Sequence, residues 1–316
     1  MRIALLLILL LLIPPLSAAD KAGPIRGDWK ADQVADGVYV IHGPLGYPTV
    51  ENQGFMNNPG FIVTDDGVVV IDPGGSVQVG ELLLSRIREI TDQPVVAVFD
   101  SHIHGDHWLG NQAIAESFAN AKLYGHPRMI AKVKTGAGDA WIAMANELTG
   151  GALAGSTVVN ANTPADQGDE FVVGGVTFRI IHNDHAHTDT DIMVHVVERG
   201  VVFLGDNCAN QRILRLDHGS LAGNIQALDL AMETGAKTFV PGHGLSGGLS
   251  VPQSYKDYLA TIYDNTKAGY EEGLSDFEIK PLVLPALTQW QDWDGFDDQV
   301  GKHVNDAYRE IEAASF

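Results

Sequence analysis

The chain has 316 residues, of which 45% are hydrophobic and 19% are charged. A chain of this length and composition can bury a large core, which argues against disorder. Forty acidic residues against 20 basic ones give a net charge of −20, and the sequence has no Lys/Arg cluster that could follow a phosphate backbone. Nucleic acid is therefore not an expected partner. Cys208 is the only cysteine, which excludes an intrachain disulfide.

The N-terminus has the pattern of a secretory signal peptide. Met1 and Arg2 precede an apolar run from Ile3 to Ile13, and small residues follow it. This run is shorter than the roughly 20 apolar residues of a membrane-spanning helix. We expect residues 1–19 to be a signal peptide cleaved after Ala18 or Ala19, and the mature protein to be periplasmic or secreted and not embedded in a membrane.

Strand-like and helix-like stretches alternate from Val38 onward without a long linker. This alternation predicts one continuous α/β domain over residues 20–316, with a C-terminal helical tail from about residue 250. A first hairpin pairs Phe61–Thr64 with Val68–Ile71. A helical stripe then runs from Gly80 to Ile90, and the apolar strand from Val95 to Phe99 follows it.

The second half of the chain also contains predicted hairpins followed by helical patterns. Two further hairpins are predicted, from Phe171 to Ile181 and from Met193 to Leu204, each turning at a glycine. Helical patterns follow at Leu221 to Met232, around Tyr255 to Ala268, and from His303 to Ala313.

A dense group of ligand-type side chains follows the strand that ends at Phe99. His102, His104, Asp106 and His107 lie within six residues. In extended chain His102 and His104 project to the same side, while Asp106 and His107 begin the next turn and can reach a second point nearby. Imidazole nitrogen and carboxylate oxygen are ligands that borderline divalent metals prefer, zinc foremost. The cluster therefore predicts a metal site that could hold two cations.

Three later residues at strand ends are candidates to complete the site. His187 precedes the strand that begins near Ile192, Asp206 follows the strand Val201 to Leu204, and His243 follows a short strand in a Pro-Gly-His turn. His185 competes with His187 for the same place. We favour His187, because it begins a His-Thr-x-x-Asp stretch.

The order and spacing of these residues resemble those of the metallo-β-lactamase superfamily of binuclear metallohydrolases. Its His-x-His-x-Asp-His signature is met by His102 to His107, and the likeness runs from about Asp32 to about Gly248. This resemblance implies a four-layer αββα sandwich of two mixed sheets flanked by helices. The C-terminal helices look similar to those of an exported subgroup of sulfur-oxidation and quinoprotein-associated zinc metallohydrolases.

The resemblance also implies a role for each ligand residue. The first metal would be held by His102, His104 and His187, the second by Asp106, His107 and His243, with Asp206 bridging both. Two Zn²⁺ ions per chain are the expected cofactors. A hydroxide held between them would attack the substrate, and Asp106 would be catalytic by orienting that hydroxide and passing its proton to the leaving group.

The implied reaction is hydrolysis of a small carbonyl compound, which could be a lactone, ester, thioester or β-lactam. A dedicated β-lactamase is one alternative. A second is a mononuclear-iron enzyme similar to persulfide dioxygenases, and a third is a metal-binding partner protein with little turnover. Asp206 and His243 favour the hydrolase, because a mononuclear site would not need a complete second ligand group.

Several other residues allow two interpretations. Asp72 could orient a ligand histidine or only form a turn with Pro73 and Gly74. Cys208 is interpreted as a buried inert thiol, although one lactamase subclass has a cysteine ligand nearby. Substrate choice is expected to depend on the segments 43–58 and 134–162, and the Gly/Ala-rich stretch 136–155 is a candidate mobile lid. Arg212 or Arg215 could bind a substrate carboxylate.

Overall fold

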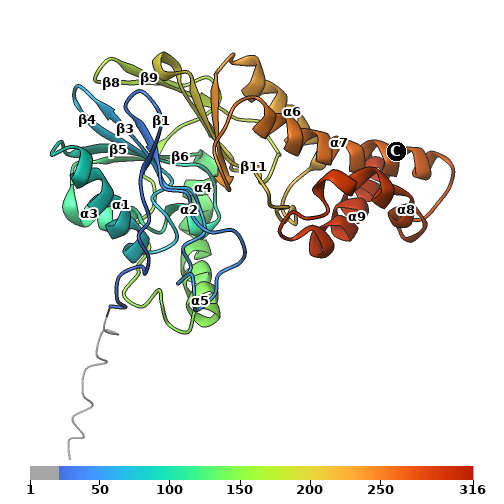
Figure 1. The fold of residues 1–316 in the computed structure, drawn as a ribbon, viewed down its shortest axis with the longest axis horizontal. Coiled ribbons are helices and arrows are strands. Elements are labelled where there is room, and N and C mark those ends of the chain that lie inside the picture. The colour runs from blue at the N-terminus through green and yellow to red at the C-terminus, as the bar shows by residue number, and fades with distance from the viewer. Residues whose placement is uncertain (1–20, 316) are drawn as a thin grey trace, which may run out of the picture.

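Two β-sheets form the centre of the computed structural model, which describes residues 21–315 (Figure 1). The expected signal peptide, residues 1–19, lies outside the described residues. Within residues 21–315 the first sheet has seven strands in chain order: β1 (Asp32–Ala35), β2 (Val38–Val40), β3 (Gly60–Thr64), β4 (Gly67–Ile71), β5 (Val95–Asp100), β6 (Lys122–Gly125) and β7 (Thr163–Pro164). The second sheet has the order β12 (Thr238–His243), β11 (Val201–Ala209), β10 (Met193–Val196), β9 (Val176–Ile181) and β8 (Glu170–Val173).

The described residues form nine α-helices, some of which cover the outer faces of the two sheets. They are α1 (Val77–Ile90), α2 (Gly105–Trp108), α3 (Asn111–Ser117), α4 (Pro127–Val133), α5 (Ala137–Leu148), α6 (Leu221–Glu233), α7 (Ser250–Glu271), α8 (Asp276–Val283) and α9 (Phe296–Ala314). Two 3₁₀ turns span Val197–Arg199 and Leu284–Trp290. All three predicted hairpins and all four predicted helical stretches are present.

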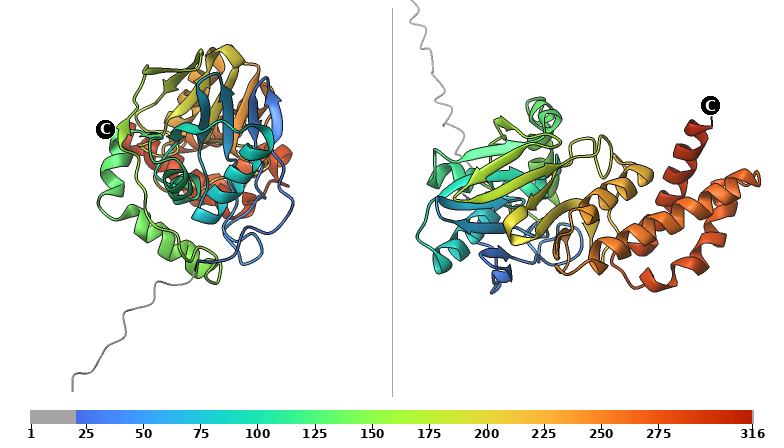
Figure 2. Two further views of the ribbon diagram at one scale, coloured as in Figure 1. Left: turned by 90° about the vertical axis from the view of Figure 1, so that its left-hand side faces the viewer. Right: turned by 90° about the horizontal axis from the view of Figure 1, so that it is seen from above.

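The strand residues alternate between two apolar cores. Val69 and Ile71 of β4 face the core between the sheets, whereas Val68 and Val70 face the core beneath α1. Because successive strand residues point to opposite faces, a β-branched run buries both faces of the sheet. A third core joins the second sheet to α6, α7 and α9. The layers are therefore helix, sheet, sheet and helix (Figure 2), as expected for the four-layer sandwich.

The two sheets share one topological unit that positions the site. In the first, the antiparallel hairpin β3–β4 is followed by α1 and the parallel strand β5. In the second, the antiparallel hairpin β10–β11 is followed by α6 and the parallel strand β12. Polar residues that sequence analysis selected lie at the carboxyl ends of β4, β5 and β12 and within β11. Open α/β sheets bind ligands beyond the carboxyl ends of their strands.

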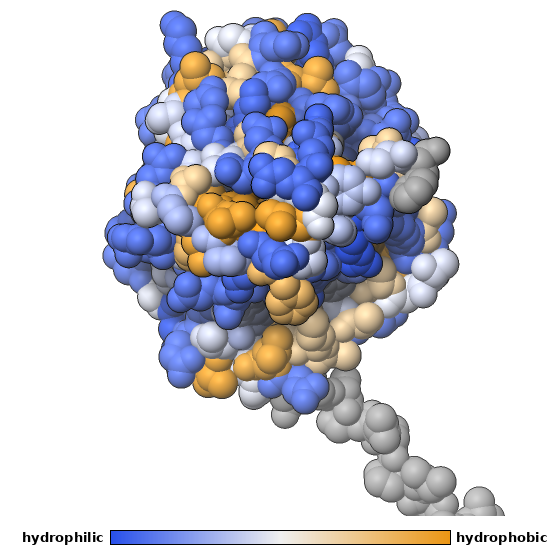
Figure 3. Space-filling model, turned by 90° about the vertical axis from the view of Figure 1, so that its right-hand side faces the viewer, coloured by the Kyte–Doolittle hydropathy of each residue, from blue (hydrophilic) through white to orange (hydrophobic). Residues whose placement is uncertain are grey.

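The C-terminal helices extend to one side of the sandwich (Figure 1). Tyr255, Tyr258 and Val304 of this extension are fully buried in the same core as Leu204 and Phe239 of the second sheet. The face at this end of the molecule is mainly hydrophilic, with small apolar patches between polar groups (Figure 3). Among the described helices we find none that combines the length and apolarity required to cross a bilayer.

Candidate metal centre

The residues of the candidate site come from four segments of the two sheets. The turn after β5 and the short helix α2 carry His102, His104, Asp106 and His107. His187 lies in the loop between β9 and β10, and β12 ends at His243. Asp206 lies inside β11 rather than after a strand, because this strand continues to Ala209 with irregular pairing beyond Gly205. The structure brings all of these side chains together.

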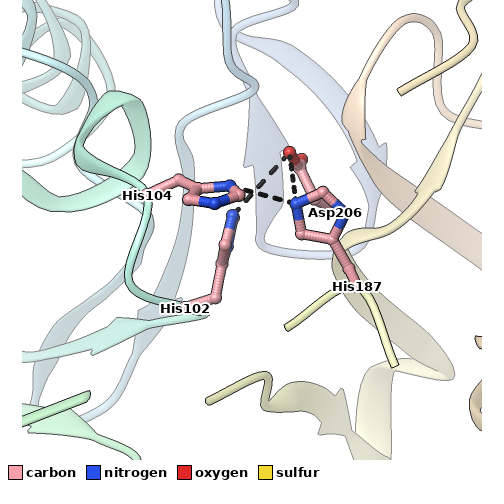
Figure 4. A group of neighbouring side chains, drawn as sticks. All are labelled: His102, His104, His187 and Asp206. Carbon is pink, nitrogen blue, oxygen red and sulfur yellow. Dashed lines mark hydrogen bonds and ion pairs between the residues drawn. The ribbon is translucent and has the colours of Figure 1, made fainter. Parts of the chain in front are cut away.

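The first group consists of His102, His104, His187 and Asp206, and each can offer a ligand atom within 4.8 Å of the others. His187 Nε2 lies 3.0 Å from His104 Nδ1. Asp206 Oδ2 lies 3.5 Å from His187 Nε2 and 3.7 Å from His102 Nε2. The side chains point toward a common centre (Figure 4).

The second group consists of Asp106, His107 and His243. Asp106 Oδ2 lies 3.5 Å from Nε2 of both histidines. The other carboxylate of the site reaches this group as well, because Asp206 Oδ1 is 3.1 Å from His107 Nε2 and 3.2 Å from His243 Nε2. The two oxygens of Asp206 thus face different groups, which is the arrangement expected of a bridging ligand.

Hydrogen bonds on the far side of the rings orient three of the histidines. His107 Nδ1 lies 2.8 Å from Asp72 Oδ2, and His243 Nδ1 lies 2.8 Å from the carbonyl oxygen of Met56. His102 Nδ1 lies 2.9 Å from Ser101 Oγ, whose hydroxyl donates to Asp72 Oδ2 at 2.7 Å. Donation from Nδ1 leaves the Nε2 lone pair free toward the centre, the tautomer that metal binding requires.

Burial keeps three imidazoles of the first group neutral. It lowers the pKa of His102 and His187 well below the ordinary range, and lowers the pKa of His104 to about 4. In the second group burial acts to lower the pKa of His107, but the carboxylates of Asp206, Asp106 and Asp72 outweigh it and raise this pKa. The pKa of Asp206 is lowered because His243 and His107 outweigh the effect of burial. Asp206 therefore stays a carboxylate.

These residues fit a pair of divalent cations. Nε2 of His102 is buried without a hydrogen-bond partner among the residues that the structure describes. Nε2 of His107 and Oδ1 of Asp206 are 3.1 Å apart but are not aligned for a hydrogen bond, so they too are unsatisfied. Buried polar atoms normally have a partner, so such orphans need an explanation. Nitrogen and oxygen ligands on tetrahedral zinc lie about 3.4 Å apart, close to the separations of 3.0–3.7 Å within the two groups. A cation in each group would satisfy the orphaned atoms.

A pocket of about 500 Å³ opens onto both groups. Its wall is mainly apolar and includes Tyr47, Met56, Trp141, Met144 and Leu148. The last three residues belong to α5, so the Gly/Ala-rich stretch predicted to be a mobile lid is largely a helix. Trp141, Met144 and Leu148 of α5 face the pocket. Their spacing of three and four residues in the sequence could have indicated a common helix face.

Arginine and cysteine side chains near the site differ in exposure. Arg212 is buried, its Nη1 lies 3.0 Å from His243 Nδ1, and its guanidinium lies over the Tyr47 ring at 5.3 Å. Arg215 is exposed at the pocket and pairs with Asp217.

Cys208 is fully buried, and burial raises its pKa well above the ordinary value. It belongs to neither ligand group, which agrees with an inert thiol.

Three comparisons place this chain among known proteins. The family model described as the metallo-beta-lactamase superfamily matches residues 52–243. A stretch of 67 residues is 30% identical to a "probable metallo-hydrolase" of Streptococcus pyogenes serotype M6, covering 21% of this chain and 27% of that protein. The chain therefore spans only a minor part of this curated relative.

Two solved structures share the fold at low identity. The inverting sec-alkylsulfatase Pisa1 of Pseudomonas sp. gives a TM-score of 0.68 at 15% identity, over 89% of this chain and 50% of that chain. A metallo-beta-lactamase from Pontibacter korlensis gives a TM-score of 0.58 at 17% identity, over 73% of this chain and 99% of that chain. The matched residues 52–243 include every residue of both ligand groups and more than half of the sequence, and the chain therefore belongs to the metallo-β-lactamase superfamily.

Proposed function

We propose that this protein is an exported hydrolase that holds two zinc ions and cleaves a small carbonyl compound, namely a lactone, ester, thioester or β-lactam. The observation that carries the proposal is the position of Asp206. Its Oδ2 faces the first ligand group and its Oδ1 faces the second. A carboxylate placed in this way suits two cations, and a single cation would leave half of the buried site without a partner.

In the proposed site the first zinc is held by His102, His104 and His187, and the second by Asp106, His107 and His243. Zinc held in this way lowers the pKa of water to about 7 and polarises a carbonyl group, which supplies a nucleophile at neutral pH. Asp206 keeps a negative charge between the groups. Asp72 holds His107 directly, and holds His102 through Ser101.

Asp106 is the proposed proton carrier. Its carboxylate is 9% exposed and lines the pocket, so one oxygen can face the second group while the other faces a substrate. A carboxylate there can accept a proton from the attacking water and transfer it to the leaving group. The other acid at the centre, Asp206, is enclosed by four histidines. Asp206 is therefore proposed to hold the two metal ions and not to transfer protons.

The pocket supports a substrate with an apolar body and an anionic group. Trp141, Met144 and Leu148 offer an apolar wall, while Arg212 and Arg215 lie on the same pocket. Guanidinium groups bind carboxylates and other oxyanions through paired hydrogen bonds. This combination favours acyl compounds that also carry a negative charge.

The test combines metal analysis with a substrate panel. We expect two zinc ions per chain, and turnover of one member among a cephalosporin, a homoserine lactone, a glutathione thioester and an anionic aryl ester. Hydrolysis of the cephalosporin alone would identify a dedicated β-lactamase. One iron per chain with oxygen consumption on a persulfide would contradict the proposal, as would full metal loading without hydrolysis of any member.

The variant Asp206→Ala tests the bridging role separately. We expect it to lose one zinc per chain and most of its turnover, because both groups lose an oxygen ligand. A variant that kept both metals and full activity would show that Asp206 does not bridge. The expected export is tested by the N-terminal sequence of the mature protein, which should begin at residue 19 or 20.

A further inference from the structure

A second cluster of ligand-type side chains lies outside the proposed zinc centre. His126 precedes α4 at the end of β6, Asp166 follows β7, and His182 follows β9. Each can offer one ligand atom within 4.8 Å of the other two. The three residues line a surface cavity of about 340 Å³. The three residues come from three different segments of the chain, so no short sequence motif contains them.

The two histidines are held against each other in an unusual way. Their ring centroids are 4.1 Å apart and their planes differ by 22°, so the rings are stacked. His126 Nε2 lies 3.4 Å from Asp166 Oδ1.

His182 has a ring nitrogen, Nε2, that makes no hydrogen bond within the described residues, and the nearest acid, Asp184, has its Oδ1 3.8 Å away. Its Nδ1 donates to the carbonyl oxygen of Asp191 at 2.6 Å, which leaves the lone pair on Nε2. This Nε2 is buried and has no hydrogen-bond partner among residues 21–315, and the side chain is only 7% exposed. A buried acceptor beside a second imidazole and a carboxylate has the surroundings of a metal ligand.

We propose that His126, His182 and Asp166 bind one divalent ion of the zinc class, separate from the catalytic pair. Two imidazoles and a carboxylate are the donors that such ions prefer, and water from the cavity can complete the coordination. Binding through Nε2 of His126 places its proton on Nδ1 and gives up a long 3.3 Å bond from the Arg128 amide. The nearby Arg128 guanidinium is paired with Asp184 at 2.8 Å, which offsets its repulsion of a cation.

This ion would fix the segment that carries His187. The segment 182–191 begins at His182, and α4 already holds it through Arg128, which donates to the carbonyl oxygens of Asp184 and Asp189. A cation would add the loop of Asp166 to this support. His187 itself stays in the proposed catalytic centre, so the new site would act by positioning.

The test measures zinc binding to the full chain by equilibrium dialysis and elemental analysis. Wild-type protein should bind one more zinc ion per chain than His182→Gln. Asp166→Asn should bind the same ion at least about 10-fold more weakly, because it removes the only charged ligand. The matched control is His185→Gln, an exposed histidine in the same loop that lies outside the cluster. It should bind as many ions as wild type.

The comparison does not depend on the catalytic centre. The expected difference between wild type and His182→Gln is one ion whether that centre holds two zinc ions, one or another metal, so failure of the proposed function leaves it measurable. Asp166 is 56% exposed, so its replacement tests the site even if His182→Gln misfolds. Equal zinc affinity and number in wild type and Asp166→Asn, with no anomalous zinc signal at His126 in crystals, would overturn the proposal.

Discussion

Asp72 accepts a hydrogen bond from His107, with Oδ2 placed 2.8 Å from Nδ1. The same carboxylate accepts bonds from the amide and the hydroxyl of Ser101, both at 2.7 Å. Asp72 has a φ of 51°, in the left-handed region that residues with a side chain rarely adopt. The contacts favour the interpretation that Asp72 orients a candidate ligand histidine, because the strained turn after β4 points its carboxylate at His107 and, through Ser101, at His102.

Asp72→Asn should weaken zinc binding. An amide cannot accept from His107 and Ser101 with the strength of a carboxylate, and losing such an outer partner lowers metal affinity about 10- to 100-fold. Chelator competition on the purified variant measures this change. The control is Ser101→Ala, which removes only the hydroxyl between His102 and Asp72 and should have a smaller effect. Unchanged affinity in Asp72→Asn would show that orientation of His107 does not depend on this acid.

Gly242 is needed for the position of Asp206. A Cβ atom at residue 242 would lie 2.1 Å from Asp206 Oδ1 and 2.9 Å from the Gly205 backbone, so the carboxylate or β11 would have to move. Gly242→Ala should lower turnover about 100-fold, the cost of a misplacement of about 1 Å within an active site. Steady-state kinetics with metal analysis check this. Gly248→Ala is the matched control, because its nearest neighbouring atom is 3.8 Å away.

Local pattern was enough to predict the three hairpins and four of the helices, whereas the four-layer sandwich was expected from the family resemblance. The β-branched runs of β3 and β4 bury alternate residues on the two faces of the first sheet, and this period is visible without knowledge of partners. The candidate ligand residues could be selected because they concentrate polar groups near strand ends. Asp206 was selected as a residue that follows a strand, but its strand runs past it to Ala209. Only the pairing with β12 shows where β11 ends.

Local pattern does not show which distant segments contact one another. The role of Asp72 depends on His107, which is brought close by the parallel pairing of β4 with β5. His126 and His182 have no motif, and only the ends of β6 and β9 place their rings together. The Gly/Ala content of the 136–155 stretch obscured α5, whose helix is fixed by packing of its apolar side chains around Trp108 and Val133.

Asp106→Asn should lower turnover more than it lowers metal content at the first group. An amide cannot accept the proton of the attacking water, and loss of a general base costs about 10²- to 10⁴-fold in rate. We expect zinc to remain in the first group, whose ligands are unchanged, and to bind more weakly in the second. Asp217→Asn is the control, because it removes an equal charge from the pocket rim away from both groups. Equal losses of rate in the two variants would contradict the role of Asp106.

His303 should make the C-terminal extension sensitive to acid. Its side chain is fully buried, Nε2 donates to the Leu214 carbonyl oxygen at 3.0 Å, and Nδ1 accepts from the Tyr258 hydroxyl at 3.0 Å. Burial lowers its pKa from 6.5 to about 4. Between pH 6.5 and about pH 4 this histidine is protonated in the unfolded chain but neutral in the folded protein. The free energy of unfolding therefore falls as the pH drops through this range.

The expected loss from this residue is about 2 kcal/mol between pH 7 and pH 5, at 1.36 kcal/mol per pH unit below 6.5. Urea unfolding of metal-free protein at both pH values measures it. His303→Gln can keep both hydrogen bonds without a titrating group, so its stability should fall less on acidification than that of wild type. His185→Gln, which replaces an exposed histidine, should follow wild type. If His303→Gln loses as much stability as wild type, the acid sensitivity comes from other buried histidines, and protonation of His303 does not contribute to unfolding in this range.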